Sequence, residues 1–211
     1  MRMRRKKHRE ERMENCSELM ITDILQYKNN IRGVFCDYKP LYIEIGCGKG
    51  KFILENATLN PDINYIAVEK NFDVLVLAME KVQAAGLTNV KFLAGDANVF
   101  AEFDTETRCD RIFINFCDPW KKSGQKKRRL THERFLDIYK KLLNPGGEVH
   151  FKTDNMKLFE FSLNSFADYG LRMKNITLDL HNSGFEGNIM TEYETLFSEQ
   201  GMPIYRCEVV F

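Results

Sequence analysis

The stretch Glu44-Ile45-Gly46-Cys47-Gly48-Lys49-Gly50 joins an apolar segment, residues 41–45, to a segment with helical spacing, residues 51–59. Glycines at three alternate positions permit a tight turn and let the backbone approach a ligand closely. The spacing differs from the dinucleotide pattern G-x-G-x-x-G, because Lys51 stands where the third glycine would be. It also lacks the G-K-[ST] ending of a phosphate-binding loop, since Phe52 follows Lys51. The stretch predicts a strand-to-helix turn that binds a ligand of another kind.

Glu44 stands two residues before the first glycine of this turn. A carboxylate there repels a pyrophosphate but attracts the cationic amino and sulfonium groups of S-adenosylmethionine. The turn thus favours a methyl donor over NAD, and its predicted cofactor-binding residues are Glu44, Gly46, Gly48 and Gly50. A turn of the same shape that binds no ligand is the alternative at this point.

Strand-like and helical segments alternate on both sides of the turn. The strand candidates are residues 41–45, 65–68, 90–93, 111–115, 148–152, 172–179 and 204–211. The helical candidates are residues 17–27, 51–59, 72–85, 97–103, 133–143, 157–169 and 192–199. Strands separated by helices form a parallel sheet covered on both faces. The pattern predicts an α/β fold with a doubly wound, mostly parallel, seven-stranded sheet of the Rossmann-like type, with an antiparallel edge near the C-terminus.

The length of 211 residues fits one domain, residues 17–211, behind a basic N-terminal arm, residues 1–16. Residues 1–12 hold seven basic and two acidic side chains, and residues 121–129 hold six basic side chains and no acid. Because the net charge is only +1, the rest of the chain is acidic. Two concentrated basic segments on an acidic body indicate a polyanionic partner, although a solvated tail and a charged loop are the simpler interpretation.

The composition also argues against several classes of protein. No apolar run reaches the length of about 18 residues that a membrane-spanning helix needs, and no apolar stretch follows the basic N-terminus, so we expect a cytoplasmic protein. The six cysteines include no C-x-x-C pair, so we expect reduced thiols and no metal. The four histidines form no recognisable catalytic arrangement.

Two further acids follow the second and third predicted strands. Glu69 comes 19 residues after Gly50, where a carboxylate in a doubly wound sheet accepts hydrogen bonds from a ribose. Asp96 lies at the next crevice position, where it can accept from an adenine amino group. A lone acid at a strand end is more often a helix N-cap, but acids at three successive strand ends behind a glycine turn favour a cofactor site.

The fourth strand ends in Asn115-Phe116-Cys117-Asp118-Pro119-Trp120, directly before the basic loop, residues 121–129. The carboxyl end of this strand borders the same crevice, so Asp118 is the predicted catalytic residue. Trp120 offers a face to a base or ribose, with packing over the sheet as the alternative. Further on, Asp154 follows the fifth strand, and Thr191 is a natural N-cap for the helix that follows it.

These segments together resemble the bacterial tRNA (guanine-N7-)-methyltransferases. The resemblance rests on E-I-G-C-G-K-G, Glu69, G-D-A, F-C-D-P-W with K-K-R-R-L, K-T-D-N and T-E-Y-E, in order across residues 41–197. The glycine turn alone marks only a broad methyltransferase class, whereas the later motifs are specific to this family. One departure is Cys117, which stands where the family commonly has proline.

The resemblance implies a site and a substrate. It implies S-adenosylmethionine contacts from Glu44, Glu69, Asp96 and Asp118, and guanine 46 of the tRNA variable loop as the target. The implied substrate contacts are Lys122, Asp154, Thr191, Glu192, Tyr193 and Glu194. The implied RNA contacts are Gly124, Gln125, Lys126, Lys127, Arg128 and Arg129. The working form is expected to be a monomer or a homodimer.

Two other functions remain open from the sequence. An N6-adenine or other amino methyltransferase is the nearest rival, but such enzymes carry an N/D-P-P-Y/F/W motif and here one proline precedes Trp120. The second is a non-catalytic module that binds the cofactor and RNA.

Overall fold

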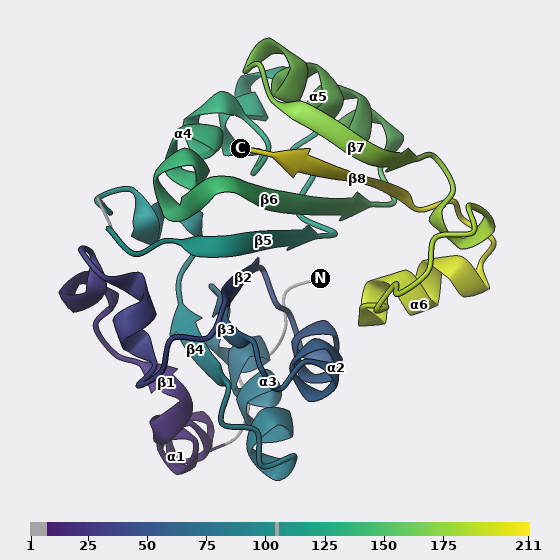
Figure 1. Cartoon of the computed structure of the whole chain (residues 1–211). Helices are drawn as coiled ribbons and strands as arrows, with labels where there is room; N and C mark the ends of the chain where they lie inside the picture. Colours follow the sequence, from purple (N-terminus) through teal and green to yellow (C-terminus); the bar gives the residue numbers. More distant parts are fainter. Residues whose placement is uncertain (1–7, 104–105) are drawn as a thin grey trace.

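The computed structural model describes residues 8–103 and 106–211, which form a central sheet with helices on both faces (Figure 1). The α-helices are α1 (Arg9–Asn15), α2 (Lys51–Leu59), α3 (Phe72–Ala84), α4 (Glu133–Leu142), α5 (Met156–Asp168) and α6 (Glu192–Glu199). The strands are β1 (Met20–Ile21), β2 (Leu41–Ile45), β3 (Asn64–Glu69), β4 (Val90–Ala94), β5 (Cys109–Asn115), β6 (Leu143–Thr153), β7 (Arg172–Thr177) and β8 (Tyr205–Val210). Among these helices, none is long and apolar enough to cross a membrane.

The strand order is β1-β4-β3-β2-β5-β6-β8-β7. Neighbouring strands from β1 to β6 are parallel, while β8 runs antiparallel to both β6 and β7. This confirms the predicted α/β fold and its antiparallel edge. The chain order reverses between β2 and β5, and ligands of doubly wound sheets bind outside the carboxyl ends of strands at such a point.

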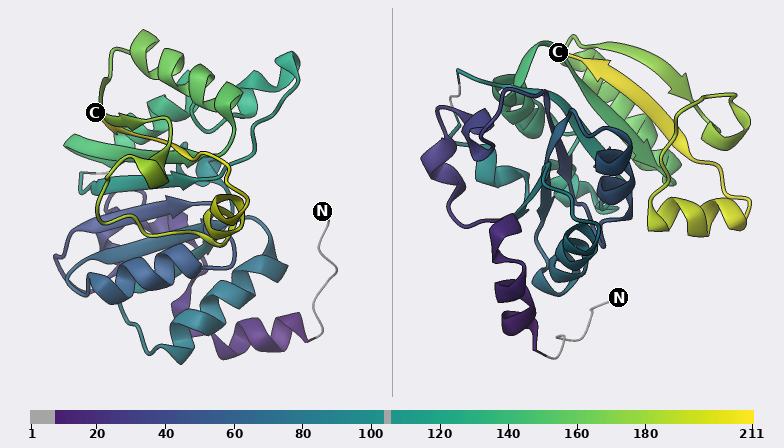
Figure 2. Two further views of the ribbon diagram at one scale, coloured as in Figure 1. Left: turned by 90° about the vertical axis from the view of Figure 1, so that its right-hand side faces the viewer. Right: turned by 60° about the horizontal axis from the view of Figure 1, so that its bottom comes forward.

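The sheet is buried on both faces in its parallel part. Along β3, Ile66 and Val68 face the core under α4 and α5, while Tyr65 and Ala67 face the core under α2 and α3. Both sets are fully buried. Because both faces of such a parallel strand need apolar side chains, its sequence is a continuous apolar run rather than an alternating one. Figure 2 shows the helices on the two sides of this sheet.

Side chains at the helix starts fix where the helices begin. Asn71, Asn155 and Thr191 each accept a backbone N–H, at the starts of α3, α5 and α6 respectively. Such N-caps satisfy donors that have no partner inside the helix. Asn71 and Asn155 closely follow the carboxyl ends of β3 and β6, so their loops lie at the same edge of the sheet.

Two predicted helices are wrong. Residues 17–27 form a 3₁₀ turn, Ser17–Leu19, then the short strand β1 and a second 3₁₀ turn, Ile24–Tyr27. Strand β1 pairs with β4 and makes the sheet eight-stranded rather than seven-stranded. Residues 97–103 hold only the 3₁₀ turn Ala97–Phe100. Both segments bury isolated apolar side chains, so their apolar spacing reflects packing of turns rather than a helical face.

Part of the expected basic arm is structured. Helix α1 lies against α3 in the described part of the chain, and Arg12 forms an ion pair of 2.6 Å with Glu80. The buried thiol of Cys16 donates to Gln83 at 3.1 Å. Arg9, also on α1, pairs with Glu10 at 3.0 Å. The remaining basic residues of the arm, which are Arg2, Arg4, Arg5, Lys6 and Lys7, lie outside the described residues. Helix α1 and Cys16, both within residues 1–16, thus pack against α3.

Candidate active site

One cleft of about 960 Å³ lies at the carboxyl ends of the parallel strands. It brings together most of the predicted site residues: Glu44, Gly46, Gly48, Glu69, Asp96, Asp118, Trp120, Arg128, Thr191, Glu192 and Tyr193. The predicted site residues outside its lining, as the described residues define it, are Gly50, Lys122, Asp154 and Glu194, together with Gly124, Gln125, Lys126, Lys127 and Arg129 of the basic loop. Acids that are far apart in sequence thus share one cavity because the strand order converges there.

The glycine turn needs glycine for two different reasons. Gly46 and Gly48 have φ of +84° and +57°, a conformation that strains side chains, and a Cβ on either would meet open space. Gly50 packs against α3, since its Cβ would lie 2.6 Å from Cβ of Ala78. Two glycines therefore shape the cleft surface, and the third seats α2 against α3.

Glu44 is the most deeply buried acid of the cleft, with 1% of its surface exposed. Nδ2 of Asn115 donates to one carboxyl oxygen at 3.1 Å, and the other oxygen has no partner within residues 8–103 and 106–211. Burial raises the pKa of Glu44 to about 8, against the opposing effects of Asn115 and Lys152. The second oxygen is thus a buried polar atom without a protein partner in the described part of the chain, on a residue that lines the cleft. Asn115 is not among the site residues predicted from the sequence. Its position at the end of β5 was the only feature that pointed to a place in the cleft.

Glu69 and Asp96 occupy the next two strand ends, as predicted. One oxygen of Glu69 accepts from the Gly48 N–H at 3.1 Å and the other from the Asn71 N–H at 2.9 Å. Asp96 caps the 3₁₀ turn and accepts from the Asn98 N–H at 2.9 Å. Glu69 therefore fixes the glycine turn to β3, and lone pairs on both carboxylates remain for a ligand.

Asp118 lies in a strained turn after β5. Phe116 and Trp120, which flank it, have φ of +53° and +43°, a region that costs non-glycine residues about 1–3 kcal/mol and is common at functional sites. The Asp118 side chain is 62% exposed and lies 3.4 Å from Nζ of Lys70. The geometry thus presents this carboxylate to the cleft.

Burial, followed by the charge of Asp118, raises the pKa of the Cys117 thiol to about 12, so the cysteine adds no thiolate here.

Arg129 is a structural residue, unlike the neighbours with which the sequence groups it. It is 8% exposed and donates to the backbone oxygens of Pro119 at 3.0 Å and Trp120 at 3.2 Å. Its guanidinium also lies 4.4 Å from the ring centre of Phe161. Arg128 covers Trp120 at 4.1 Å from the ring centre. Of the expected RNA contacts, Gly124, Lys126, Lys127 and Arg128 are exposed and Gln125 is half-buried.

Arg129→Ala is expected to lower the free energy of unfolding by roughly 2–3 kcal/mol, because two turn carbonyls lose their donor and packing against Phe161 is lost. Urea unfolding of the variant measures this loss. Lys127→Ala, on the same loop but exposed, is the matched control and should change stability by less than about 0.5 kcal/mol. Equal stability of the two variants would contradict the structural assignment of Arg129.

The start of α6 forms another wall of the cleft. Thr191 caps the helix, and Glu192 forms an ion pair of 3.0 Å with Lys81 of α3. Tyr193 is 59% exposed and stacks on Phe197. Glu194 is fully buried and accepts from Nζ of Lys152 at 2.7 Å. The first three residues face the cleft, whereas Glu194 points into the protein.

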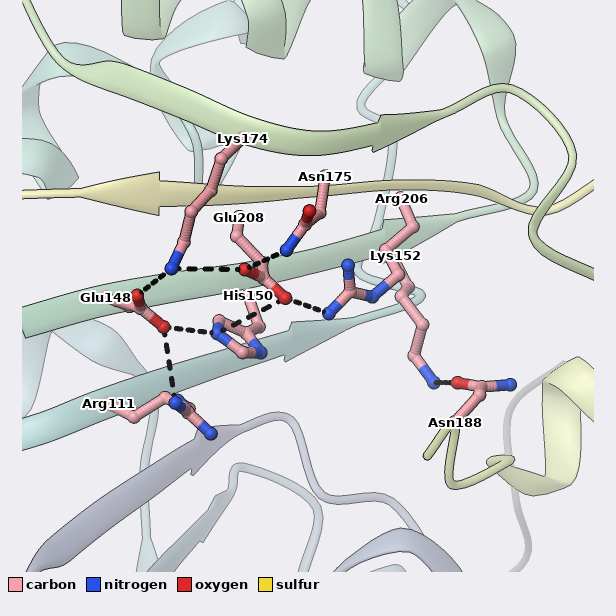
Figure 3. A network of polar contacts seen from close by, with 9 residues as sticks. All are labelled: Arg111, Glu148, His150, Lys152, Lys174, Asn175, Asn188, Arg206 and Glu208. Carbon is pink, nitrogen blue, oxygen red and sulfur yellow. Dashed lines mark hydrogen bonds and ion pairs between the residues drawn. The ribbon is translucent and has the colours of Figure 1, made fainter. Parts of the chain in front are cut away.

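A network of charges covers the face of β6 and β8 opposite α4 and α5 (Figure 3). Glu148, His150 and Glu208 place possible metal-ligand atoms within 4.8 Å of one another. Cations already pair with both carboxylates, namely Arg111, Lys174 and Arg206. Burial lowers the pKa of His150 to about 4. Burial alone would raise the pKa of Glu148, but the hydrogen bonds from Lys174 and His150 outweigh it and lower that pKa to about 2. This balanced network does not favour an additional cation.

The strand order, the glycine turn and the acids at successive strand ends define an S-adenosylmethionine-dependent methyltransferase. A solved structure described as an antibiotic related methyltransferase has the same fold, with a TM-score of 0.61, 15% identity, and coverage of 99% of this chain and 96% of that one. A family model described as a putative methyltransferase matches residues 38–207.

Two curated relatives identify the family more closely. The tRNA (guanine-N(7)-)-methyltransferase of Halalkalibacterium halodurans is 47% identical over 100% of this chain and 96% of its own length. The enzyme of the same name from Clostridioides difficile is 48% identical over 99% of this chain and 98% of its own length. The chain belongs to the tRNA (guanine-N(7)-)-methyltransferase family.

Proposed function

We propose that the protein transfers the methyl group of S-adenosylmethionine to N7 of a guanine in tRNA, at position 46 of the variable loop. The observation that carries this proposal is the single cleft that holds Glu44, Glu69 and Asp118 beside an exposed basic loop. Carboxylates suit a cationic donor, and lysines and arginines suit an RNA backbone. A tRNA substrate also implies that the enzyme works in the cytoplasm.

The donor fits the three strand ends of the cleft. The unpartnered oxygen of Glu44 receives the amino group of the methionine part. Glu69 accepts hydrogen bonds from the ribose, and Asp96 accepts from the adenine amino group, each with lone pairs that the turn leaves available. The order of the strands then brings the sulfonium group toward the turn after β5, where Asp118 lies.

The reaction needs alignment and charge stabilisation rather than a base. Guanine N7 carries a lone pair and no hydrogen, so it attacks the methyl carbon directly while the carbon–sulfur bond breaks. Positive charge moves from sulfur to the guanine ring. Asp118 stabilises that charge, and Asp154, whose charge is felt at neighbouring Cys117, adds to the negative field. Holding both reactants in line supplies the remainder of the acceleration.

The walls of the cleft suggest how the guanine is held. Tyr193 offers an exposed aromatic face, and Thr191 and Glu192 lie beside it. Trp120 carries Arg128 on its ring, so this pair presents a guanidinium next to the cleft. A guanine enters such a site only after it leaves its stack in the tRNA, and aromatic rings replace part of the lost stacking.

The exposed basic loop is expected to bind RNA phosphates. Replacing Lys126 and Lys127 with alanine should weaken tRNA binding and reduce the slope of log affinity against log salt by about 1.4–1.8, since each lost phosphate contact removes about 0.7–0.9. Filter binding at several salt concentrations measures the slope. The matched control is Lys140→Ala together with Lys141→Ala, a basic pair on α4, which should leave the slope unchanged. An unchanged slope in the loop variant would contradict its role.

The experiment that tests the function uses purified protein, methyl-labelled S-adenosylmethionine and unmodified tRNA. Digestion of the product to nucleosides should place the label on N7-methylguanosine. Label on adenine would favour the amino methyltransferase. Binding of both ligands without any methylated product would favour the non-catalytic module.

A further inference from the structure

Three lysines from three different elements hold the segment that leads into α6, residues 188–194, hereafter the entry segment. Lys51, the first residue of α2 after the glycine turn, donates to the backbone oxygen of Met190 at 2.9 Å. Lys81 of α3 pairs with Glu192 at 3.0 Å. Lys152 of β6 makes three contacts, which are Oδ1 of Asn188 at 3.0 Å, the backbone oxygen of Ile189 at 2.8 Å and Glu194 at 2.7 Å. The entry segment is thus fixed to the cofactor side of the cleft.

Lys152 is the central residue of this arrangement. It is 5% exposed, and burial lowers its pKa, which the charge of Glu194 and its hydrogen bond oppose. Its ammonium lies 5.3 Å from the ring centre of Phe52, so apolar surroundings leave it few other partners. Figure 3 shows it extending from the sheet toward Asn188. A buried charge of this kind is stable only with its counter-charge in place.

Glu194 is equally committed to the interior. One of its oxygens accepts from Lys152, and the other accepts from Nδ2 of Asn188 at 2.6 Å and lies 3.3 Å from Nε2 of His181. Its side chain has no exposed surface. A substrate base in the cleft therefore meets Glu192 and Tyr193 rather than Glu194.

We propose that Lys152 is a positioning residue for methyl transfer and that Glu194 acts through it, without touching the guanine. The pair fixes the entry segment, so that Glu192 and Tyr193 form the wall of the cleft next to the turn after β5. Phe197 of α6 lies 6.1 Å from Phe116 of that turn, ring centre to ring centre, which shows how close the two walls are. This inference rests on the proposed function for the identity of the reaction.

A double-mutant cycle separates positioning from direct contact. Lys152→Met and Glu194→Gln each leave one buried group without its partner, and each should lower kcat/KM for tRNA by about 10²-fold or more. The double variant removes the charge of both and should recover to within about tenfold of the wild type, a large coupling between the two sites. Lys174→Met, which breaks an ion pair on the same sheet face far from the entry segment, is the control and should keep normal activity.

Two readouts exclude a merely structural effect. S-adenosylhomocysteine affinity of Glu194→Gln, which keeps the charge of Lys152 near Glu44, should stay within about threefold of the wild type. In both single variants kcat for tRNA should fall, and chymotrypsin should cleave faster after Tyr193 in the entry segment. Equal loss of cofactor affinity and activity would overturn positioning in favour of general destabilisation. A double variant as inactive as Glu194→Gln, with its fold intact, would overturn the proposal in favour of direct contact.

The proposed function and the positioning role fail in different ways. If the wild type methylates adenine instead of guanine N7, the proposed function fails. The double-mutant cycle can then be measured on the methylated adenine, and recovery of activity in the double variant would still support the positioning role of Lys152. If no product forms at all, the rate of proteolytic cleavage within the entry segment replaces activity as the quantity compared in the cycle. Faster cleavage in each single variant, and a return to the wild-type rate in the double variant, would support the positioning role. Normal protection in both single variants would overturn it.

Discussion

Asp118→Ala is expected to reduce methyl transfer by about 10³-fold while tRNA affinity changes by less than about threefold. The carboxylate lies in the cleft at 62% side-chain exposure, held there by a strained turn. Its charge matters most when the guanine ring becomes positive, and groups that stabilise such charge are worth about 10²–10³ in rate. Single-turnover methylation at saturating cofactor, together with filter binding, measures both effects.

The control for this variant is Lys70→Ala. It removes the cation that lies 3.4 Å from Asp118 but keeps the carboxylate. Because this ion pair is exposed, its loss should change stability little and leave turnover within a few-fold of the wild type. Near-normal turnover of a folded Asp118→Ala variant would remove Asp118 from the mechanism.

Glu44→Gln is expected to weaken S-adenosylmethionine binding by about tenfold to 100-fold, because a charge-assisted hydrogen bond to the donor's ammonium is lost. Calorimetric titration with S-adenosylhomocysteine, which keeps that ammonium, measures the loss. Gln preserves the shape and the bond with Asn115, so the variant tests charge rather than packing. Unchanged affinity would contradict the placement of the amino group at Glu44.

The same variant should change the pH dependence in a defined direction. Burial raises the pKa of Glu44 in the folded protein to about 8, above its ordinary value of 4.5. The stability that this group contributes is therefore fully present below pH 4.5 and is lost as the pH rises toward 8. The neighbours that act on it are Lys152, Glu192 and Glu69, after Asn115. Without ligand, Glu44→Gln should thus gain stability relative to the wild type as the pH rises from 5 to 8.

Ligand binding should show the reverse trend. The carboxyl group must lose its proton to pair with an ammonium, so binding releases a proton, and wild-type affinity rises by up to tenfold per pH unit as the pH approaches 8. Glu44→Gln should lose this dependence. Thermal melts at several pH values, with and without S-adenosylhomocysteine, measure both trends, and parallel curves for the two proteins would contradict the linkage.

The residues at the carboxyl ends of the strands could be placed in one cleft from the sequence alone, because their position follows from the order of strands and helices. Glu44 and Glu69 lie at the carboxyl ends of the apolar strands β2 and β3, and Asp118 follows β5. Parallel topology alone places these strand ends at one edge of the sheet. The two-residue strand β1 was not predictable, because it is too short to show a period. Its pairing with β4 comes from burial of Ile21, which a single sequence does not distinguish from a helical position.

The roles of individual charged residues depended on contacts between distant parts of the chain. Arg129 looks like its basic neighbours, yet Phe161 and two turn carbonyls make it structural. Lys152 and Glu194 are 42 positions apart and form a buried pair only after β6 and α6 meet. Motif spacing finds residues near the cleft, but burial decides whether each one faces the ligand or the interior.

A crystal structure with S-adenosylhomocysteine and guanosine would show whether the cleft aligns donor and acceptor for methyl transfer. We expect the donor's amino group at Glu44, its ribose at Glu69, and guanine N7 roughly 3–4 Å from where the methyl carbon would lie, with Asp118 beside the purine. A donor bound on another face, or a guanine that points N7 away from sulfur with Asp118 remote from both, would contradict it.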